Sequence, residues 1–296
     1  MHVSALYGRD RPVVSFEFFP PKTADGEAAL VRTIEALRAL QPGFVTVTRT
    51  GARPREVSVE LAARIKALGI ESAAHVTCIE ASREELRRHF DLMTARGIDN
   101  VVAIRGDAAH LHGRSAPVDG FRWAVDMIRF IREGGWPLCI AGAGHPEGHP
   151  ECRDLDRGMA YLREKVEAGL EVVITQLFFD NATYFAFVER AQRYGIHVPI
   201  VAGIMPITNV AQIRRMVELS GNAIPKLLEA QLVASQDDPA RTLAVGVEWA
   251  TQQCIELLER GAPGLHFYTL NQSPATRAIF ENLRARGLVG AVGEQG

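Results

Sequence analysis

The chain has 296 residues, of which 47% are hydrophobic and 23% are charged, and its formal net charge is -2. This composition predicts a globular protein with a large core, and the even spread of Lys and Arg argues against a nucleic-acid-binding surface. No apolar run is long enough to span a bilayer and the first twelve residues lack the apolar core of a signal peptide, so we expect a cytoplasmic protein without a membrane partner.

The apolar segments predict a strand-and-helix alternation along the whole chain. Eight short runs rich in Val and Ile are separated by segments whose apolar residues recur at helical spacing, and Ser82-x-x-Glu85 is typical of a capping box at a helix start. No linker or change in composition divides the chain, so we expect one parallel sheet in a single domain. The expected strands are 13–18, 44–48, 72–78, 100–104, 138–142, 171–176, 199–203 and 264–269.

Eight such units in roughly 250 residues favour a (β/α)8 TIM barrel over an open doubly wound sheet. The segment between the seventh and eighth strands is too long for one helix, so we expect an extra helix over 223–235 before a helix over 239–260. The predicted domain is therefore a single barrel over 1–296, with a frayed tail from about 285 to 296.

Polar residues and glycines follow nearly every expected strand. Because active sites of such barrels form at the carboxyl ends of the strands, these residues are the candidates for a site, although loops are polar in any case. They are Glu17, Thr48, His75, residues 105–107, residues 145–149, Gln176, residues 205–206 and residues 268–271.

The stretch SFEFFPPK places one carboxylate, Glu17, among phenylalanines just before two prolines. Alternation along a strand puts Ser15 and Glu17 on one face and Phe16 and Phe18 on the other. An inward carboxylate surrounded by aromatic rings loses hydration, which disfavours its charged form and suits a general acid. The alternative is a structural Glu paired with a Lys or Arg inside the barrel.

Two further motifs have competing interpretations. The tripeptide 105–107 follows a strand, where Gly106 would let a planar ligand approach the backbone, but a simple turn with an ion pair explains it as well. The segment GAGHPEGHPE, over 142–151, suggests a metal, yet its prolines prevent two histidines from sharing a helix face. The four cysteines, Cys78, Cys139, Cys152 and Cys254, also lack the paired spacing of zinc sites, so we expect no metal and reduced thiols.

Eight segments taken together, in order at successive strand ends, resemble the methylenetetrahydrofolate reductase family in its bacterial single-domain type, from about residue 13 to residue 282. This resemblance implies a barrel that reduces 5,10-methylenetetrahydrofolate to 5-methyltetrahydrofolate, with hydride passing from NADH or NADPH to bound FAD and then to the folate. The segments are SFEFFPPKT, FVTVT, AHVTCI, VVAIRGD, HPEGHPE, ITQLFFD, GIMPIT and HFYTLN.

The resemblance also assigns roles. Glu17 matches the catalytic glutamate that assists the protonation opening the methylene bridge, and Asp107 matches an aspartate that contacts the pterin and stabilises developing positive charge. The folate-contact positions fall on Thr48, Asp107, Gln176, Gln212 and Gln272, the last of which replaces a common arginine. The FAD-contact positions fall on Thr48, His75, Arg105, Gly106, Asp107, Trp123, Ala124, His145, His149 and Lys165.

Several flavin positions depart from the family pattern. Arg49 replaces a tyrosine in a shortened loop, and His145 replaces another tyrosine. Gly158, Tyr161 and Glu164 stand where Asp, Asn and Arg are common, and a Glu near a diphosphate would repel it. Arg49 is expected to compensate for these changes.

Three functions remain open from the sequence. The first is an FAD enzyme, the second a flavin-free enzyme with direct hydride transfer from the nicotinamide, and the third a folate-binding barrel without turnover. Retention of Glu17, Asp107 and Gln176 favours an enzyme. The expected partners are folate and nicotinamide substrates, and self-association as a homo-oligomer is left open.

Overall fold

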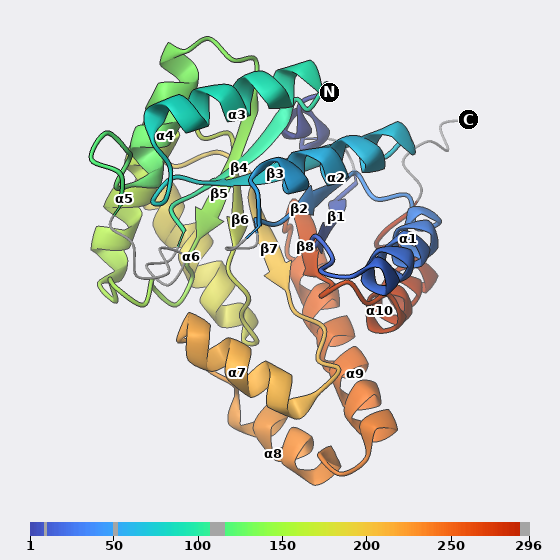
Figure 1. Cartoon of the computed structure of the whole chain (residues 1–296). Helices are drawn as coiled ribbons and strands as arrows, with labels where there is room; N and C mark the ends of the chain where they lie inside the picture. The colour runs from blue at the N-terminus through green and yellow to red at the C-terminus, as the bar shows by residue number, and fades with distance from the viewer. Residues whose placement is uncertain (9–10, 50–52, 107–115, 291–296) are drawn as a thin grey trace.

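In the computed structural model, which describes residues 1–8, 11–49, 53–106 and 116–290, eight parallel strands form a closed barrel in chain order. The first strand pairs with the last, with Ser15 opposite His266, and this pairing closes the sheet (Figure 1). The predicted TIM barrel is confirmed. Its strands are β1 Val13–Phe18, β2 Phe44–Val47, β3 Ser72–Thr77, β4 Asn100–Ile104, β5 Cys139–Gly144, β6 Val172–Thr175, β7 Ile200–Ile204 and β8 Gly264–Tyr268.

Helices follow the strands and cover the outside of the barrel. The predicted capping box is present at α3, where Ser82 Oγ accepts the N–H of Glu85 and the Glu85 carboxylate accepts the N–H of Ser82. The helices are η1 Val3–Leu6, α1 Ala24–Arg38, α2 Glu56–Ala67, α3 Arg83–Ala95, α4 Ala124–Glu133, α5 Leu155–Glu167, α6 Asn181–Arg193, α7 Val210–Ser220, α8 Lys226–Ser235, α9 Pro239–Glu259 and α10 Pro274–Ala285.

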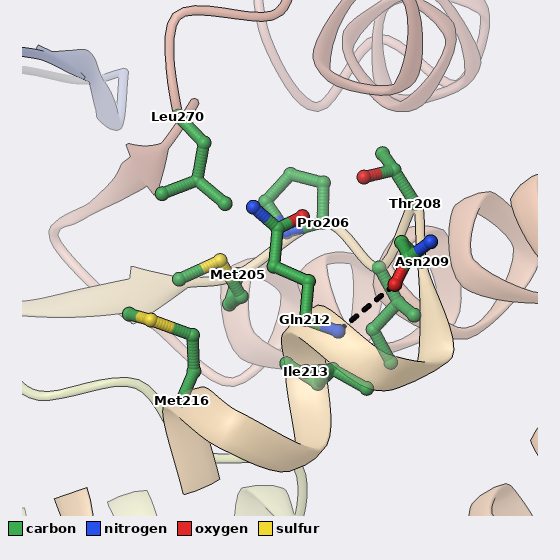
Figure 2. A pocket seen from close by; sticks show the side chains of 9 residues that line it. Met205, Pro206, Thr208, Asn209, Gln212, Ile213, Met216 and Leu270 are labelled. Atoms are coloured by element: carbon green, nitrogen blue, oxygen red, sulfur yellow. Dashed lines mark hydrogen bonds between the residues drawn. The ribbon is translucent and has the colours of Figure 1, made fainter. Parts of the chain in front are cut away.

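The chain between β7 and β8 forms α7, α8 and α9, so the extra helix predicted over 223–235 is confirmed as α8, and α7 is an addition that the sequence did not predict. In Figure 1, α7 and α8 lie beside each other below the barrel, and α9 runs next to α8. The start of α7 is fixed by a cap, because Asn209 Oδ1 accepts the backbone N–H of Gln212 at 2.9 Å (Figure 2). This cap sets where the Gln212 side chain stands above β7.

The alternation of side chains along β1 sorts its residues between two environments. Phe16 and Phe18 belong to the main core cluster, which includes Leu30 and Ile34 of α1, so they face the helices. Glu17 therefore faces the barrel interior. That interior is filled by a separate small cluster of apolar residues, which are Ala73, Val102, Ala141, Val172, Ile174 and Val201.

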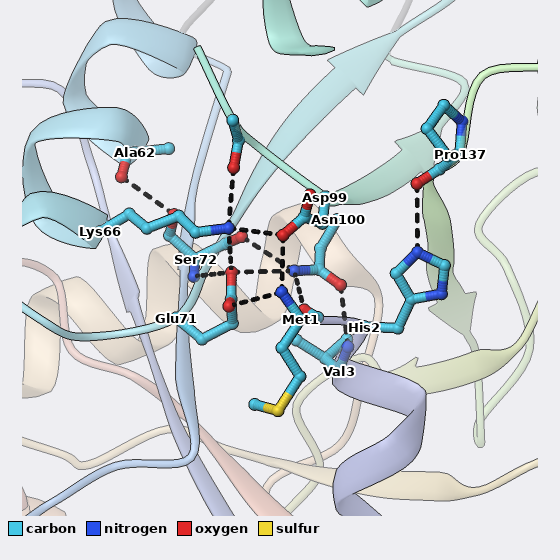
Figure 3. Close-up of polar contacts among 11 residues, drawn as sticks. Met1, His2, Val3, Ala62, Lys66, Glu71, Ser72, Asp99, Asn100 and Pro137 are labelled. Carbon is cyan, nitrogen blue, oxygen red and sulfur yellow. Dashed lines mark hydrogen bonds and ion pairs between the residues drawn. The ribbon is translucent and has the colours of Figure 1, made fainter.

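The end of the barrel at which the strands begin is closed by η1 and a polar cluster (Figure 3). The amine of Met1 lies 3.0 Å from Glu71 Oε2 and 2.6 Å from Asp99 Oδ2, and Lys66 Nζ lies 2.5 Å from the same Asp99 oxygen. Asn100 at the start of β4 accepts the N–H of Val3. These contacts occupy this end of the barrel and leave the opposite rim for a site.

The chain beyond α10 packs back on the barrel. Leu288 N–H donates to Leu283 O, and Val289 is 6% exposed within the main core. The frayed tail predicted from about residue 285 to 296 stays a prediction, and residues 291–296 lie outside the described part. Within the described residues, no helix is both long enough and apolar enough to cross a bilayer.

Candidate functional site

The carboxylate of Glu17 lies inside the barrel between two histidines from other strands. Its Oε2 is 3.4 Å from His75 Nε2 on β3 and 3.7 Å from His266 Nε2 on β8. The three side chains are only 8%, 11% and 1% exposed. Glu17 is one residue before the end of β1, so this group stands near the carboxyl ends of the strands, where barrel enzymes carry their chemistry.

The neighbours of Glu17 correct two expectations from the sequence. Phe16 and Phe18 do not surround the carboxylate, because adjacent residues of a strand point to opposite faces. The structural alternative, a Lys or Arg partner, is also wrong among the described residues, where the ion-pair partners of Glu17 are His75 and His266. Burial lowers the pKa of His75, and the Glu17 carboxylate opposes this shift. The contact is therefore between a carboxyl group and a largely neutral imidazole.

His266 connects Glu17 to Ser15 on the same side of β1. Ser15 Oγ lies 2.8 Å from His266 Nδ1 and 3.4 Å from the carbonyl oxygen of Leu265. If the Ser15 hydroxyl donates to the Leu265 carbonyl oxygen, then His266 Nδ1–H donates to Ser15 and His266 Nε2 presents a lone pair toward Glu17. If the Ser15 hydroxyl instead donates to His266 Nδ1, then the proton of the ring is on Nε2 and points toward Glu17. The first tautomer suits a protonated Glu17, which can donate to the lone pair, and the second suits an ionised Glu17, which can accept from Nε2–H.

Tyr268 crosses the barrel interior beside this group. Its hydroxyl donates to the carbonyl oxygen of Thr175 at 2.6 Å, and burial followed by the Glu17 charge raises its pKa. Thr175 Oγ1 in turn accepts the N–H of Gly203 at 2.8 Å. The phenol is thus fixed as a neutral wall of the site.

The predicted folate contacts lie on separate elements of the same rim. Gln176 follows β6, with its N–H donating to Gly144 O at 2.7 Å and its own Oε1 accepting the N–H of Leu177 at 2.9 Å. Gln272 is exposed, and its N–H donates to Thr269 O at 2.9 Å. Gln272 as a folate contact stays a prediction.

Gln212 lines a shallow hollow above the end of β7. Figure 2 shows its amide between Pro206 and Leu270, with Met205 and Met216 below. The space inside is about 10 Å³, roughly that of one water molecule, so a ligand can lie against the wall of the hollow but cannot enter it whole. The residues that line it are Met205, Pro206, Ile207, Thr208, Asn209, Gln212, Ile213, Met216 and Leu270.

The residues after β4 form a surface of stacked and paired groups. The Arg105 guanidinium donates to both carboxylate oxygens of Glu151, at 2.7 and 2.5 Å, and its carbon lies 5.4 Å from the centre of the Trp123 ring. Trp123 is the N-cap of α4, which begins at Ala124. The predicted catalytic Asp107 lies outside the described residues.

Gly106 has a left-handed backbone, with φ of 85°. A Cβ here would lie 3.1 Å from Ile79 Cγ2 and 3.2 Å from Thr77 Cβ. The expectation that this glycine makes room for a planar ligand is thus not supported on that side, because neighbouring protein side chains fill the space. The conformation and this packing together account for the glycine.

His145, His149 and Lys165 lie together near the end of β5. The two imidazole rings are 4.8 Å apart edge to face, and Lys165 Nζ donates to the carbonyl oxygen of Ala143 at 2.8 Å. Burial lowers the pKa of Lys165 to about 8, and burial with the nearby Lys165 charge lowers the pKa of His145 to about 3. His145 is therefore neutral at pH 7, whereas Lys165 remains largely charged.

The positions that depart from the family pattern make contacts within the protein. Glu164 Oε1 accepts from Arg129 at 2.8 Å, which offsets the charge that was expected to repel a diphosphate. Tyr161 OH accepts from Arg157 Nε at 2.7 Å, and a Cβ on Gly158 would meet nothing within 4 Å. These departures on α5 leave open space and a balanced charge.

Arg49, proposed from the sequence to compensate in the flavin site, is held by contacts within the protein. Its Nη2 lies 3.1 Å from Glu80 Oε1 and its Nη1 donates to Arg53 O at 2.6 Å, with the side chain 8% exposed. Arg55 also pairs with Glu80 at 3.4 Å. Arg49 is thus part of a buried structural ion-pair cluster.

Two buried polar atoms at the rim lack a hydrogen-bond partner in the described part of the chain. They are Thr48 Oγ1 and His75 Nε2, and both residues are predicted FAD contacts. Buried polar groups are nearly always hydrogen-bonded, so these two atoms suit a bound polar group. His75 Nε2 already lies 3.4 Å from Glu17 Oε2, so Thr48 Oγ1 is the atom whose missing partner a bound polar group, such as part of a flavin, would supply. No cluster of three or more His, Cys, Asp or Glu side chains that would suit a metal occurs within the described ranges.

Sequence reasoning missed the role of His266. The available signal was its place two residues before Tyr268 in an alternating strand, but its contact with Glu17 depends on the pairing of β1 with β8.

A model of the family named methylenetetrahydrofolate reductase matches residues 3–284 of the chain. The chain belongs to the methylenetetrahydrofolate reductase family. A 5,10-methylenetetrahydrofolate reductase from Pectobacterium carotovorum subsp. carotovorum is 35% identical over 276 residues, covering 92% of this chain and 90% of that protein.

Plant members of the methylenetetrahydrofolate reductase family are longer. Methylenetetrahydrofolate reductase (NADH) 1 from Arabidopsis thaliana is 35% identical over 294 residues, which cover 95% of this chain and 50% of that protein. This chain therefore spans about half the length of that relative.

Solved structures show the same fold at low identity. An uncharacterised protein from Clostridium thermocellum, described as binding two copies of 5-methyl-5,6,7,8-tetrahydrofolic acid, superposes with a TM-score of 0.67 at 17% identity and covers 94% of this chain and 95% of its own. This likeness concerns the barrel alone.

Proposed function

We propose that the protein reduces 5,10-methylenetetrahydrofolate to 5-methyltetrahydrofolate with NADH or NADPH, and that its barrel acts as a single catalytic domain. Family membership supports the reaction, and the observation that carries the proposal is the buried Glu17 carboxylate between His75 and His266. A carboxyl group held at the carboxyl ends of barrel strands is suited to protonating a nitrogen of the methylene bridge.

The protein's own groups can hold and move the required proton. Protonated Glu17 donates from Oε2 to the bridging nitrogen, and the ring opens to an iminium that accepts hydride. With the Ser15 hydroxyl donating to Nδ1, His266 carries its proton on Nε2 and donates a hydrogen bond from there toward the carboxylate that remains. The 3.7 Å separation of His266 from Glu17 is long, as is common for catalytic contacts in unliganded sites.

Asp107 is proposed to stabilise the positive charge that develops on the pterin. The proposal is supported by the family resemblance of the segment VVAIRGD, and Asp107 itself lies outside the described residues. Gln176 and Gln212 are proposed to contact the folate from β6 and α7.

FAD would be held by Thr48, His75, Trp123 and Lys165, with Thr48 Oγ1 gaining the hydrogen-bond partner that it lacks. When bound there, FAD supplies a carrier that takes hydride from the nicotinamide and gives it to the folate. The charged ammonium of Lys165 would face its phosphates. The remaining family positions, Arg105, Gly106, Ala124, His145 and His149, would line the same face.

One observation favours the second candidate, direct hydride transfer from the nicotinamide. Arg105 and Arg49 are both paired with carboxylates of the protein, Glu151 and Glu80. Fewer positive groups are then available to a flavin diphosphate than the sequence suggests.

The visible absorption spectrum of the purified protein separates these candidates. Flavin bands that bleach with anaerobic NADH and return on adding methylenetetrahydrofolate would support the FAD enzyme. A colourless protein that oxidises NADH only in the presence of methylenetetrahydrofolate would support direct transfer. Binding of the folate without any turnover by either donor would contradict the proposed reaction and point to a binding barrel.

A further inference from the structure

The backbone just after β8 adopts an unusual conformation at two adjacent residues. Leu270 and Asn271 have φ of 50° and 59°, in the left-handed region that favours glycine. For a bulky residue such as Leu this conformation is strained, and it persists only where surrounding contacts hold it. The contacts around these residues therefore indicate what the strain maintains.

A set of hydrogen bonds ties this segment to the end of β1. Asn271 Oδ1 accepts the N–H of Phe19 at 2.8 Å, and Asn271 Nδ2 donates to Phe19 O at 2.8 Å. Thr269 Oγ1 donates to Glu17 O at 2.5 Å. We call residues 269–271 the bracket, because they bind both the backbone of Glu17 and the residue that follows its strand.

The same bracket places Leu270 in the wall of the hollow beside Gln212. Figure 2 shows the Leu270 side chain above Met205 and beside the Gln212 amide. Thr33 Oγ1 also donates to Asn271 O at 3.2 Å, which anchors the bracket to α1. One short segment thus fixes both the strand that carries the acid and one wall of the hollow beside Gln212.

We propose that Asn271 is a positioning residue, which through its bonds to Phe19 holds Leu270 and Glu17 in register, so that an apolar part of the folate in the hollow sets the reacting nitrogen against Glu17. This inference rests on the proposed function. Strain at Leu270 is the cost of turning its side chain into the hollow, and the bonds of Asn271 to Phe19 offset it.

Glycine variants test this proposal without adding strain, because glycine adopts positive φ freely. Leu270→Gly removes the side chain that forms one wall of the hollow and keeps the hydrogen bonds of Thr269 and Asn271. Asn271→Gly removes the two side-chain hydrogen bonds to Phe19 and leaves Leu270 free to move. Asn282→Ala is the control, since it removes one side-chain bond, to Thr251 Oγ1 on α9, away from the rim. The readouts are kcat, the KM for methylenetetrahydrofolate and the melting temperature.

We expect Leu270→Gly to raise the folate KM about tenfold, or about 1.4 kcal/mol, with kcat within twofold of wild type. Asn271→Gly should raise KM similarly and also lower kcat severalfold, and the double variant should have no higher KM than Leu270→Gly. A lower melting temperature with unchanged kcat and KM for Asn271→Gly would reduce the bracket to a structural role and overturn the inference. Wild-type protein without folate reduction would instead contradict the proposed function.

Discussion

Gly203 of β7 and Tyr268 of β8 share one space inside the barrel. A Cβ on residue 203 would lie 2.8 Å from the Tyr268 ring and also against the carbonyl oxygen of Thr175, to which the phenol donates. The absence of a side chain at position 203 is what lets the tyrosine cross the interior beside Glu17.

Gly203→Ala should therefore destabilise the protein by about 3 kcal/mol or more, because the added methyl group meets backbone as well as the ring. Gly158→Ala is the matched control, since a Cβ there meets nothing within 4 Å and alanine favours the helix, so stability should rise by roughly 0.5–1 kcal/mol. Urea unfolding of both variants measures the difference. Equal stability of the two variants would contradict the shared-space account.

Glu17→Gln should lower folate reduction by about 10²-fold or more while leaving the fold intact, because the amide keeps the shape of the side chain and cannot donate an acidic proton. Glu84→Gln, at a side chain that is 63% exposed, controls for the loss of one carboxylate. Steady-state turnover and circular dichroism together make the measurement. Turnover equal to wild type would remove Glu17 from the acid role.

Ser15→Ala should reduce turnover by a smaller factor, about tenfold, because His266 loses the Nδ1 partner that keeps its proton on Nε2, facing Glu17. The pH dependence of kcat should change as well, which a purely structural loss would not produce. Ser72→Ala is a fair comparison, since it removes a buried hydroxyl bonded to Ala62 O at the opposite end of the barrel. If the two variants behaved alike, the Ser15 hydroxyl would have no part in orienting His266 toward Glu17.

His89 of α3 should make the fold sensitive to mild acid. Burial, with Arg55 and Arg49 adding to it, lowers its pKa from 6.5 to about 4, and its Nδ1 has no hydrogen-bond partner in the described chain. The unfolded state then binds the proton more readily, so this contribution to stability is complete above pH 6.5 and is lost as pH falls toward 4.

Between pH 7 and pH 5 the wild type should lose roughly 2 kcal/mol from this residue alone. His89→Leu should lack that part of the loss, so the difference in stability between the two proteins should change by this amount over the same range. Denaturant unfolding at the two pH values provides the test. Parallel pH profiles would show that His89 is not buried as a neutral base.

The fold was predictable because short apolar runs alternate clearly with segments whose apolar residues recur at helical spacing. The prediction for β5 stopped at Gly142, whereas the strand reaches Gly144. Glycine residues favour a loop prediction from composition alone, but Gly144 pairs with Thr175 of β6 inside a sheet that has no free edge at this point. The end of β5 is therefore set by pairing with its neighbouring strand.

Site residues were predictable from the sequence only where the pattern of a single strand indicates them. Glu17 was found because a lone carboxylate near a strand end is visible in sequence, yet its partners His75 and His266 come from two other strands. The pairing of Arg49 with Glu80 was likewise invisible, because it depends on how two rim loops meet. Contacts between side chains of different strands can be identified only once the order and register of the strands in the closed barrel are known.

The seam between β1 and β8 also constrains how the protein is made. Ser15 and His266 are 251 positions apart in the chain, so the strand that carries Glu17 waits for its second neighbour until nearly the whole sequence has been synthesised. Pairings between such distant segments form slowly, since a long loop must close before any contact rewards it. The chemical centre is therefore completed by the last strand to arrive, and a nascent or truncated chain that lacks β8 holds Glu17 on an open sheet edge.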